Sequence, residues 1–98
     1  MDKVKITEFF TNLKGIAEEK GATNLLVGSP PRIDNTDEIC DYIVQLEFWY
    51  NDKFHITSTN GYSEEDDQFE LLFLDREDEP WLYPVGKFRT EEEFLQLL

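Results

Sequence analysis

The chain has a single cysteine and a single histidine, Cys40 and His55, so a nucleophilic dyad or a nitrogen–sulfur metal site could only use this pair. A reactive cysteine needs an electropositive setting that lowers its pKa. This chain offers the opposite, with 22 Asp and Glu against 9 Lys and Arg and a formal net charge of −13. Zinc needs more nitrogen and sulfur ligands than these two residues supply. We therefore predict a buried structural thiol at Cys40 and an outward-facing strand residue at His55.

Carboxylates are the other candidate chemical groups, and many of them form two runs beside an apolar stretch at residues 69–74. Residues 63–98 carry 12 acids and 3 bases, net −9, against 10 acids and 6 bases, net −4, in residues 1–62. The two runs consist of Glu64, Glu65, Asp66 and Asp67 before the stretch, and of Asp75, Glu77, Asp78 and Glu79 after it. Runs of like charge are commonly solvated loops. They can also occupy the Lys and Arg sites that bind nucleic-acid phosphates, and we predict that these residues bind a partner.

Neither acidic run has the ligand spacing of a calcium loop, so no metal site is expected. The sequence also lacks the glycine-rich phosphate and dinucleotide motifs and the nucleophile elbow of the common enzyme classes. A pair of carboxylates for glycoside hydrolysis can be proposed in any chain this acidic and therefore indicates little. We expect a non-enzymatic protein without a cofactor, and keep a carboxylate- or metal-dependent enzyme or a housekeeping domain as less favoured alternatives.

Four aromatic residues are not clearly assigned to the predicted core: Trp49, Tyr62, Trp81 and Tyr83. Packing under loops is the common fate of such residues, but aromatic side chains are also enriched at protein interfaces. Trp49 and Trp81 are therefore predicted partner contacts beside the acidic runs. Stacking on nucleic-acid bases is disfavoured, because proteins that stack on bases pair their aromatics with positive grooves.

The length and composition are typical of one folded domain over residues 1–98. Hydrophobic residues make up 40% of the chain and aromatic residues 14%, which is enough for a core despite the high charge. A single cysteine excludes an internal disulfide and favours a reducing compartment. The N-terminal residues lack the apolar segment of a signal peptide, and no apolar run is long enough to span a bilayer. We expect a soluble, cytoplasmic protein.

Apolar residues near the N-terminus recur with helical spacing and predict an amphipathic helix that ends at Gly21. They are Ile6, Phe9, Phe10, Leu13, Ile16 and Ala17. Thr7 is a plausible N-cap, and Asp2 is the alternative for a helix that starts earlier.

Alternating apolar residues from Cys40 to Tyr50 predict a long strand, followed by a return strand from Phe54. A two-residue loop, Asn51-Asp52, would place Phe48 opposite His55, whereas a three-residue loop at 51–53 places Phe48 opposite Ile56 and Tyr50 opposite Phe54. The three-residue loop pairs apolar with apolar residues and is the one we predict.

The remaining elements are shorter. Residues 24–28 and 68–74 are predicted strands, the second with two apolar faces and hence central, and residues 81–85 are a weak edge strand because of Pro84. Thr90 and Glu93 form a capping box that starts a C-terminal helix. The predicted fold is α+β: an antiparallel sheet of about four strands with an N-terminal and a short C-terminal helix packed on it.

A negative field of this size repels nucleic acid and anionic membranes and attracts basic protein surfaces. We therefore expect a small acidic protein, a monomer or weak dimer, that inhibits a partner by occupying its basic, nucleic-acid-binding site in the manner of a DNA mimic. It would not bind nucleic acid itself. The alternative is an immunity protein that neutralises a cognate toxin. In size, acidity and helix-plus-sheet plan the chain resembles small phage-encoded inhibitors that imitate DNA and some bacterial toxin-immunity proteins; the resemblance is one of bulk character and assigns no residue roles.

Overall fold

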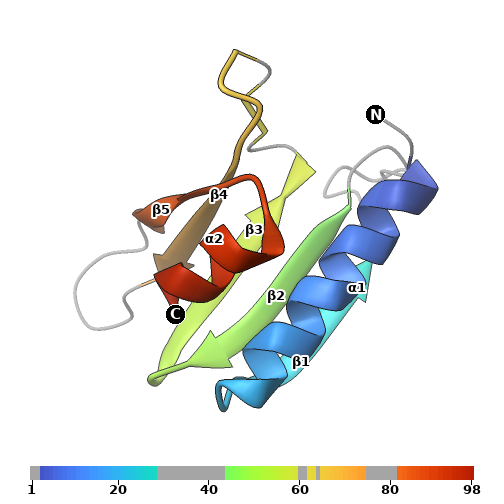
Figure 1. The fold of residues 1–98 in the computed structure, drawn as a ribbon. Helices are drawn as coiled ribbons and strands as arrows, with labels where there is room; N and C mark the ends of the chain where they lie inside the picture. The colour runs from blue at the N-terminus through green and yellow to red at the C-terminus, as the bar shows by residue number, and fades with distance from the viewer. Residues whose placement is uncertain (1–2, 29–43, 60–61, 64, 75–81) are drawn as a thin grey trace, which may run out of the picture.

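The computed structural model describes residues 3–28, 44–59, 62–63, 65–74 and 82–98. The predictions made for Asp2, Cys40, Glu64, Trp81 and the acidic run at 75–79 therefore lie outside the described residues. The elements, in chain order, are α1 (Lys3–Glu19), β1 (Thr23–Gly28), β2 (Gln45–Tyr50), β3 (Lys53–Ser58), β4 (Phe69–Leu74), β5 (Leu82–Phe88) and α2 (Glu91–Leu97) (Figure 1).

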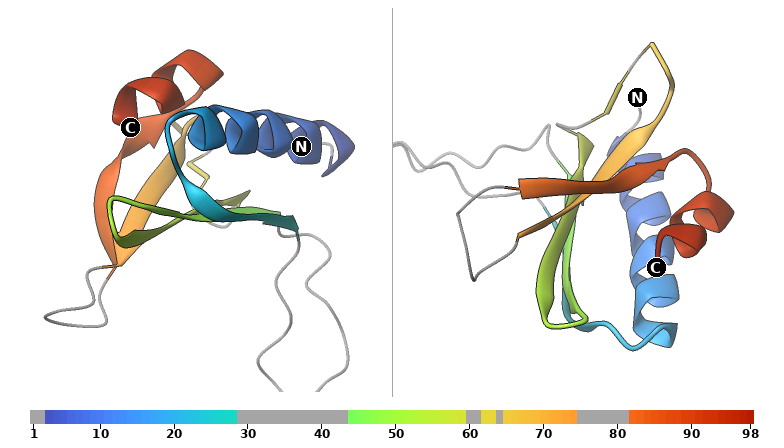
Figure 2. Two further views of the ribbon diagram at one scale, coloured as in Figure 1. Left: turned by 90° about the horizontal axis from the view of Figure 1, so that it is seen from below. Right: turned by 90° about the vertical axis from the view of Figure 1, so that its left-hand side faces the viewer.

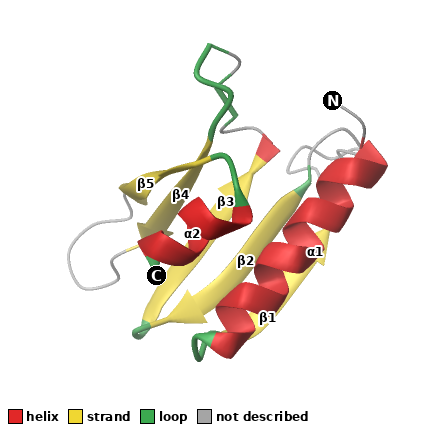
Figure 3. Cartoon of the chain, viewed as in Figure 1, coloured by secondary structure: helices red, strands yellow, loops and turns green. Residues whose placement is uncertain are grey.

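The strands form one antiparallel meander in the order β1-β2-β3-β4-β5, and both helices lie on the same face of it (Figures 2 and 3). This is the predicted α+β arrangement, with five strands instead of about four. The weakly predicted edge strand does join the sheet as β5. Pro84 is tolerated there because it lies on an edge strand, beside an irregularity in the β4–β5 register.

The helix α1 begins at Lys3, so Thr7 lies inside the helix and its carbonyl accepts a hydrogen bond from the Thr11 hydroxyl (2.7 Å). The prediction of Thr7 as N-cap is therefore wrong, and the earlier start is correct. The predicted end is confirmed, because Gly21 adopts a left-handed conformation (φ 98°) just beyond the helix. The Ala22 amide then donates to the Ala17 carbonyl (3.0 Å), which completes a Schellman turn.

The core lies between the helices and the inner face of the sheet, and the described residues buried there include four phenylalanines with no exposed surface. Phe10 on α1 meets Phe69 on β4 edge-on, with ring centroids 5.3 Å apart. Phe94 on α2 meets Phe88 on β5 in the same way at 5.1 Å, and Phe48 on β2 at 6.2 Å. Aromatic contacts of this geometry stabilise beyond the area they bury, so they fix both helices on the sheet.

The helix α2 begins as predicted, because the Thr90 hydroxyl accepts a hydrogen bond from the Glu93 amide (3.2 Å). At its other end the Tyr50 hydroxyl donates to the carbonyl of Leu98 (3.0 Å), which ties the C-terminal residue to β2.

The β2–β3 hairpin has the two-residue loop, so the predicted three-residue loop is wrong. Asn51 and Asp52 both have positive φ (52° and 62°), which is the conformation of a type I′ turn. The twist of this turn matches that of the flanking strands, and this outweighs the pairing of apolar residues that favoured the longer loop. Phe48 pairs with His55, and Leu46 pairs with Thr57.

The two polar residues that this register buries both have hydrogen-bond partners. His55 is 7% exposed and its Nδ1 lies 2.9 Å from the Lys53 carbonyl oxygen. Thr57 is 1% exposed and donates from its hydroxyl to the Glu70 carbonyl (2.9 Å). Burying polar groups costs little when they are paired, so the core tolerates the register.

Gly86 on β5 allows α2 to pack closely, because a Cβ at this position would lie 2.5 Å from Cδ2 of Leu97. Because the contact is with the far end of a flexible side chain, we expect Gly86→Ala to displace Leu97 and to lower the free energy of unfolding by about 1 kcal/mol. Gly15→Ala is the control, because a Cβ at Gly15 meets nothing within 4 Å, and it should stabilise α1 by about 0.5–1 kcal/mol.

Urea unfolding of both variants checks this prediction. Leu97→Ala makes room for the new Cβ, so the double variant with Gly86→Ala should be more stable than the sum of the two single effects predicts. Strict additivity would show that the close approach at Gly86 does not limit the packing of α2.

Candidate functional site

Residues 65–67 of the first predicted acidic run lie in a tight turn between β3 and β4. The amide of Ser63 donates to the Gln68 carbonyl (2.9 Å), and the two residues form an isolated antiparallel bridge that closes the turn. Glu65, Asp66 and Asp67 are exposed at its tip. We call these three residues the acidic turn.

Hydrogen bonds hold two of the three carboxylates of the acidic turn. The Tyr62 hydroxyl donates to Asp67, which has a positive φ of 53°. The amide of Asp66 donates to the Ser63 hydroxyl (3.4 Å), and its carboxylate forms an ion pair with the Lys87 ammonium at 3.5 Å. Both members of that ion pair are about half exposed, and such pairs add little stability. Together, the hydrogen bonds of Tyr62 and Ser63 and this ion pair hold Asp66 and Asp67 in one arrangement in the structure.

The described part of the chain carries only a minority of the excess negative charge. It contains 12 of the 22 acidic and 7 of the 9 basic residues, net −5. The other 10 acids and 2 bases, net −8, lie outside it. The predicted distance between the two acidic runs, roughly 20 Å along the intervening six-residue strand, stays a prediction because residues 75–79 are not described.

The face of the sheet opposite the helices, which we call the outer face, carries two adjacent apolar rows. The register of all five strands places Thr23, Trp49, Phe54, Leu74 and Leu82 in the first row, and Leu26, Glu47, Ile56, Leu72 and Pro84 in the second. Eight of these ten residues are apolar, the exceptions being Thr23 and Glu47. The next row is polar: Gln45, Ser58, Glu70 and Lys87.

Trp49 lies in the first row, where its ring meets Phe54 edge-on at 5.9 Å. The exposed apolar residues include Leu26 on β1, at 59% exposed, and Leu82 on β5, at 50%. The side chains in the middle of the rows, on β2, β3 and β4, are partly exposed. Among the described residues, the outer face therefore carries an apolar band that Thr23 on β1 and Glu47 on β2 interrupt.

Sequence reasoning found Trp49 but missed the rest of this band. The predicted three-residue loop places Phe54 and Ile56 opposite Tyr50 and Phe48, on the face that packs against the helices, and this is wrong. Leu72 and Leu74 were noticed as a second apolar face of β4, and β4 does lie between two strands as predicted. The second apolar face of β4 was thus visible in the sequence, where it indicated a central strand with both faces buried. In the structure both helices lie on the other side of the sheet (Figure 2).

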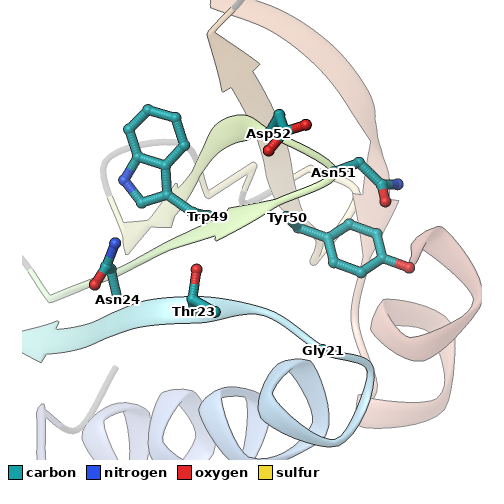
Figure 4. Close-up of a pocket in the computed structure, with 7 residues that line it drawn as sticks. All are labelled: Gly21, Thr23, Asn24, Trp49, Tyr50, Asn51 and Asp52. Carbon is teal, nitrogen blue, oxygen red and sulfur yellow. The ribbon is translucent and has the colours of Figure 1, made fainter.

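A shallow hollow of about 350 Å³ lies beside the β2–β3 hairpin (Figure 4). The Trp49 and Tyr50 side chains that line it point to opposite sides of β2 (Figure 4), and the Tyr50 hydroxyl is bonded to Leu98. The polar groups that line this hollow do not converge on one point, whereas a catalytic or ligand site requires convergent polar groups. Within the described ranges, no group of three or more His, Cys, Asp and Glu could hold a metal ion, and no helix is long and apolar enough to cross a membrane.

His55 was predicted to face outward, and this is wrong: it lies on the inner face. Its ring stacks on Phe48 with centroids 5.1 Å apart and planes 10° from parallel, and Tyr50 and Phe73 contact it as well. Burial lowers the pKa of His55; the hydrogen bond to the Lys53 carbonyl raises the pKa, and the Lys53 charge lowers it further. Burial and stacking therefore favour the neutral form of the ring.

Comparison of the chain with protein-family models, with curated proteins and with solved structures finds no match. The residues and their geometry therefore carry the functional argument alone.

The lowered pKa of His55 predicts a pH dependence of stability. Between the folded pKa and 6.5 the unfolded chain binds more protons than the folded protein, so stability rises with pH. The contribution of His55 is complete above pH 6.5 and is lost as the pH falls toward the folded pKa. Carboxylates titrate mainly below this window.

His55→Phe keeps a planar ring against Phe48 and removes the titration. Urea unfolding from about pH 7.5 to about pH 5.5 should show a steeper loss of stability in the wild type than in this variant. Equal slopes for the two proteins would show that His55 is not buried in its neutral form.

Proposed function

We propose that this chain is a non-enzymatic binding protein that occupies a basic site on another protein. The observation that carries the proposal is the acidic turn, in which the exposed carboxylates of Asp66 and Asp67 are oriented by Ser63, Lys87 and Tyr62. Charged groups that are fixed before binding lose less conformational entropy when a partner arrives. The net charge of −13 adds long-range attraction to a cationic surface.

A nucleic-acid-binding cleft is the kind of basic site we favour. Duplex DNA presents a closely spaced series of phosphate charges along its axis, and rigid carboxylates can meet the same Lys and Arg residues. The protein would then inhibit by exclusion, because nucleic acid and the chain cannot occupy the cleft together. Such a complex should weaken as salt is added.

An immunity protein that neutralises one cognate toxin is the second candidate, and the outer face favours it. Dedicated complexes depend on a few buried apolar and aromatic residues, and the apolar rows with Trp49 can supply them. The two candidates differ in breadth: a DNA mimic would block several unrelated nucleic-acid-binding proteins, and an immunity protein would bind a single partner tightly.

Pull-down from a host lysate with stepwise salt elution tests the proposal, with two variants that each lose three exposed charges. The first replaces the acidic turn with amides, and the control does so on α1: Glu65→Gln, Asp66→Asn and Asp67→Asn against Glu8→Gln, Glu18→Gln and Glu19→Gln. We expect the recovered partner to have a basic surface and to bind the first variant at least about tenfold more weakly than the control.

Recovery of partners without a basic surface, held through contacts that salt does not weaken, would contradict the proposal. Equal retention of both variants would show that the acidic turn is only a solvated surface.

A further inference from the structure

We infer that the apolar rows of the outer face make the central contact with the partner, packing against an apolar surface that is bordered by Lys and Arg. This inference rests on the proposed function, because it concerns the same basic partner, and it names the surface that binds it. Charge then supplies attraction and orientation, and the apolar rows supply most of the affinity.

The first support is the position of the exposed apolar residues. Leu26 and Leu82 lie at the two ends of the band, on the two edge strands of the sheet, and expose 59% and 50% of their surface. The first row runs from Leu82 through Leu74, Phe54 and Trp49. The second row contains Leu72 and Ile56, and Glu47 separates Ile56 from Leu26. Contiguous exposed apolar surface of this kind marks an interaction site in a water-soluble fold, whereas single exposed residues do not.

The second support is the size of the band. Five strands spaced about 4.8 Å apart make each row about 20 Å across. This is the scale of the central part of a standard protein interface, which is surrounded by a polar rim. The sheet also curls toward the helices, since β4 and β5 bend out of the plane of β1–β3 on the α2 side (Figure 2). The outer face is therefore convex and suited to a groove.

Charge identifies the occupant. Glu47 lies within the second row and Asp52 at the tip of the hairpin, and in the polar row beside the second row Glu70 pairs with Lys87 on β5. A second copy of the chain would bring a further −13 against these carboxylates, and nucleic acid would be repelled as well. A protein whose apolar surface is bordered by Lys and Arg complements both the rows and their acidic border.

Two synthetic peptides serve as probes, one with alternating Leu and Lys and one of the same length with alternating Ser and Lys. They carry equal positive charge, and only the first has an apolar side. Titration calorimetry and amide chemical shifts should show that the Leu/Lys peptide binds at least about tenfold more tightly, because burying even one leucine is worth about that much. The largest shifts should fall in the strands at the apolar rows.

A pair of matched double variants tests the location. Leu26→Glu with Leu82→Glu places two charges on the outer face, and Val4→Glu with Leu95→Glu places two on the helices, where the residues are 65% and 38% exposed. The first variant should lose the preference for the Leu/Lys peptide, and the second should keep it. Thermal melting checks folding, and Leu26→Ser with Leu82→Ser replaces the first variant if it unfolds.

The outcomes separate this inference from the proposed function. Equal affinity for the two peptides would overturn the inference and leave a purely electrostatic site. Failure of both peptides to bind would contradict the proposed function as well. Dimerisation that Leu26→Glu with Leu82→Glu abolishes would assign the outer face to a second copy and overturn the basic partner.

Discussion

The register of the β2–β3 hairpin is the constraint on which the rest of the structure depends. Asn51 and Asp52 take up two consecutive left-handed conformations, and the tight turn fixes Phe48 opposite His55. Side chains alternate between the faces of a strand, so a slip of one residue would exchange every inward and outward side chain of β3. The core, the pKa of His55 and the apolar outer face all follow from this turn.

The turn produces an unusual distribution of polar and apolar residues. It places His55 and Thr57 in the core, where each forms a hydrogen bond with a backbone carbonyl. The His55 ring also stacks on Phe48. It places Phe54 and Ile56 on the face away from the helices. Sequences normally agree with their fold at every level, and departures from that agreement concentrate at functional sites. The hairpin is such a departure, which is why the outer face, together with the acidic turn, is the surface we assign to partner binding.

Much of the fold could be predicted from the sequence, because helix spacing, the Gly21 stop, the Thr90 capping box and the strand alternation are local signals. The hairpin register could not be predicted, because two effects favour different loops. Side-chain pairing favours the three-residue loop, which matches apolar with apolar residues, whereas backbone twist favours the two-residue loop. The wrong loop also led to the wrong prediction that His55 faces outward, and it hid the apolar residues of the outer face. Of the predicted site residues, the structure describes Glu65, Asp66, Asp67 and Trp49. The hydrogen bonds of Asp67 with Tyr62 and of Asp66 with Ser63 depend on the turn geometry, which no sequence pattern predicts.

Solution NMR of the hairpin tests this account most directly. Cross-strand nuclear Overhauser effects should connect Phe48 with His55 and Leu46 with Thr57, and the ring protons of His55 should be shifted by stacking on Phe48. Effects that connect Phe48 with Ile56 and Tyr50 with Phe54 would establish the three-residue loop. That result would move Phe54 and Ile56 into the core and His55 to the surface, and it would interrupt both apolar rows of the outer face at β3.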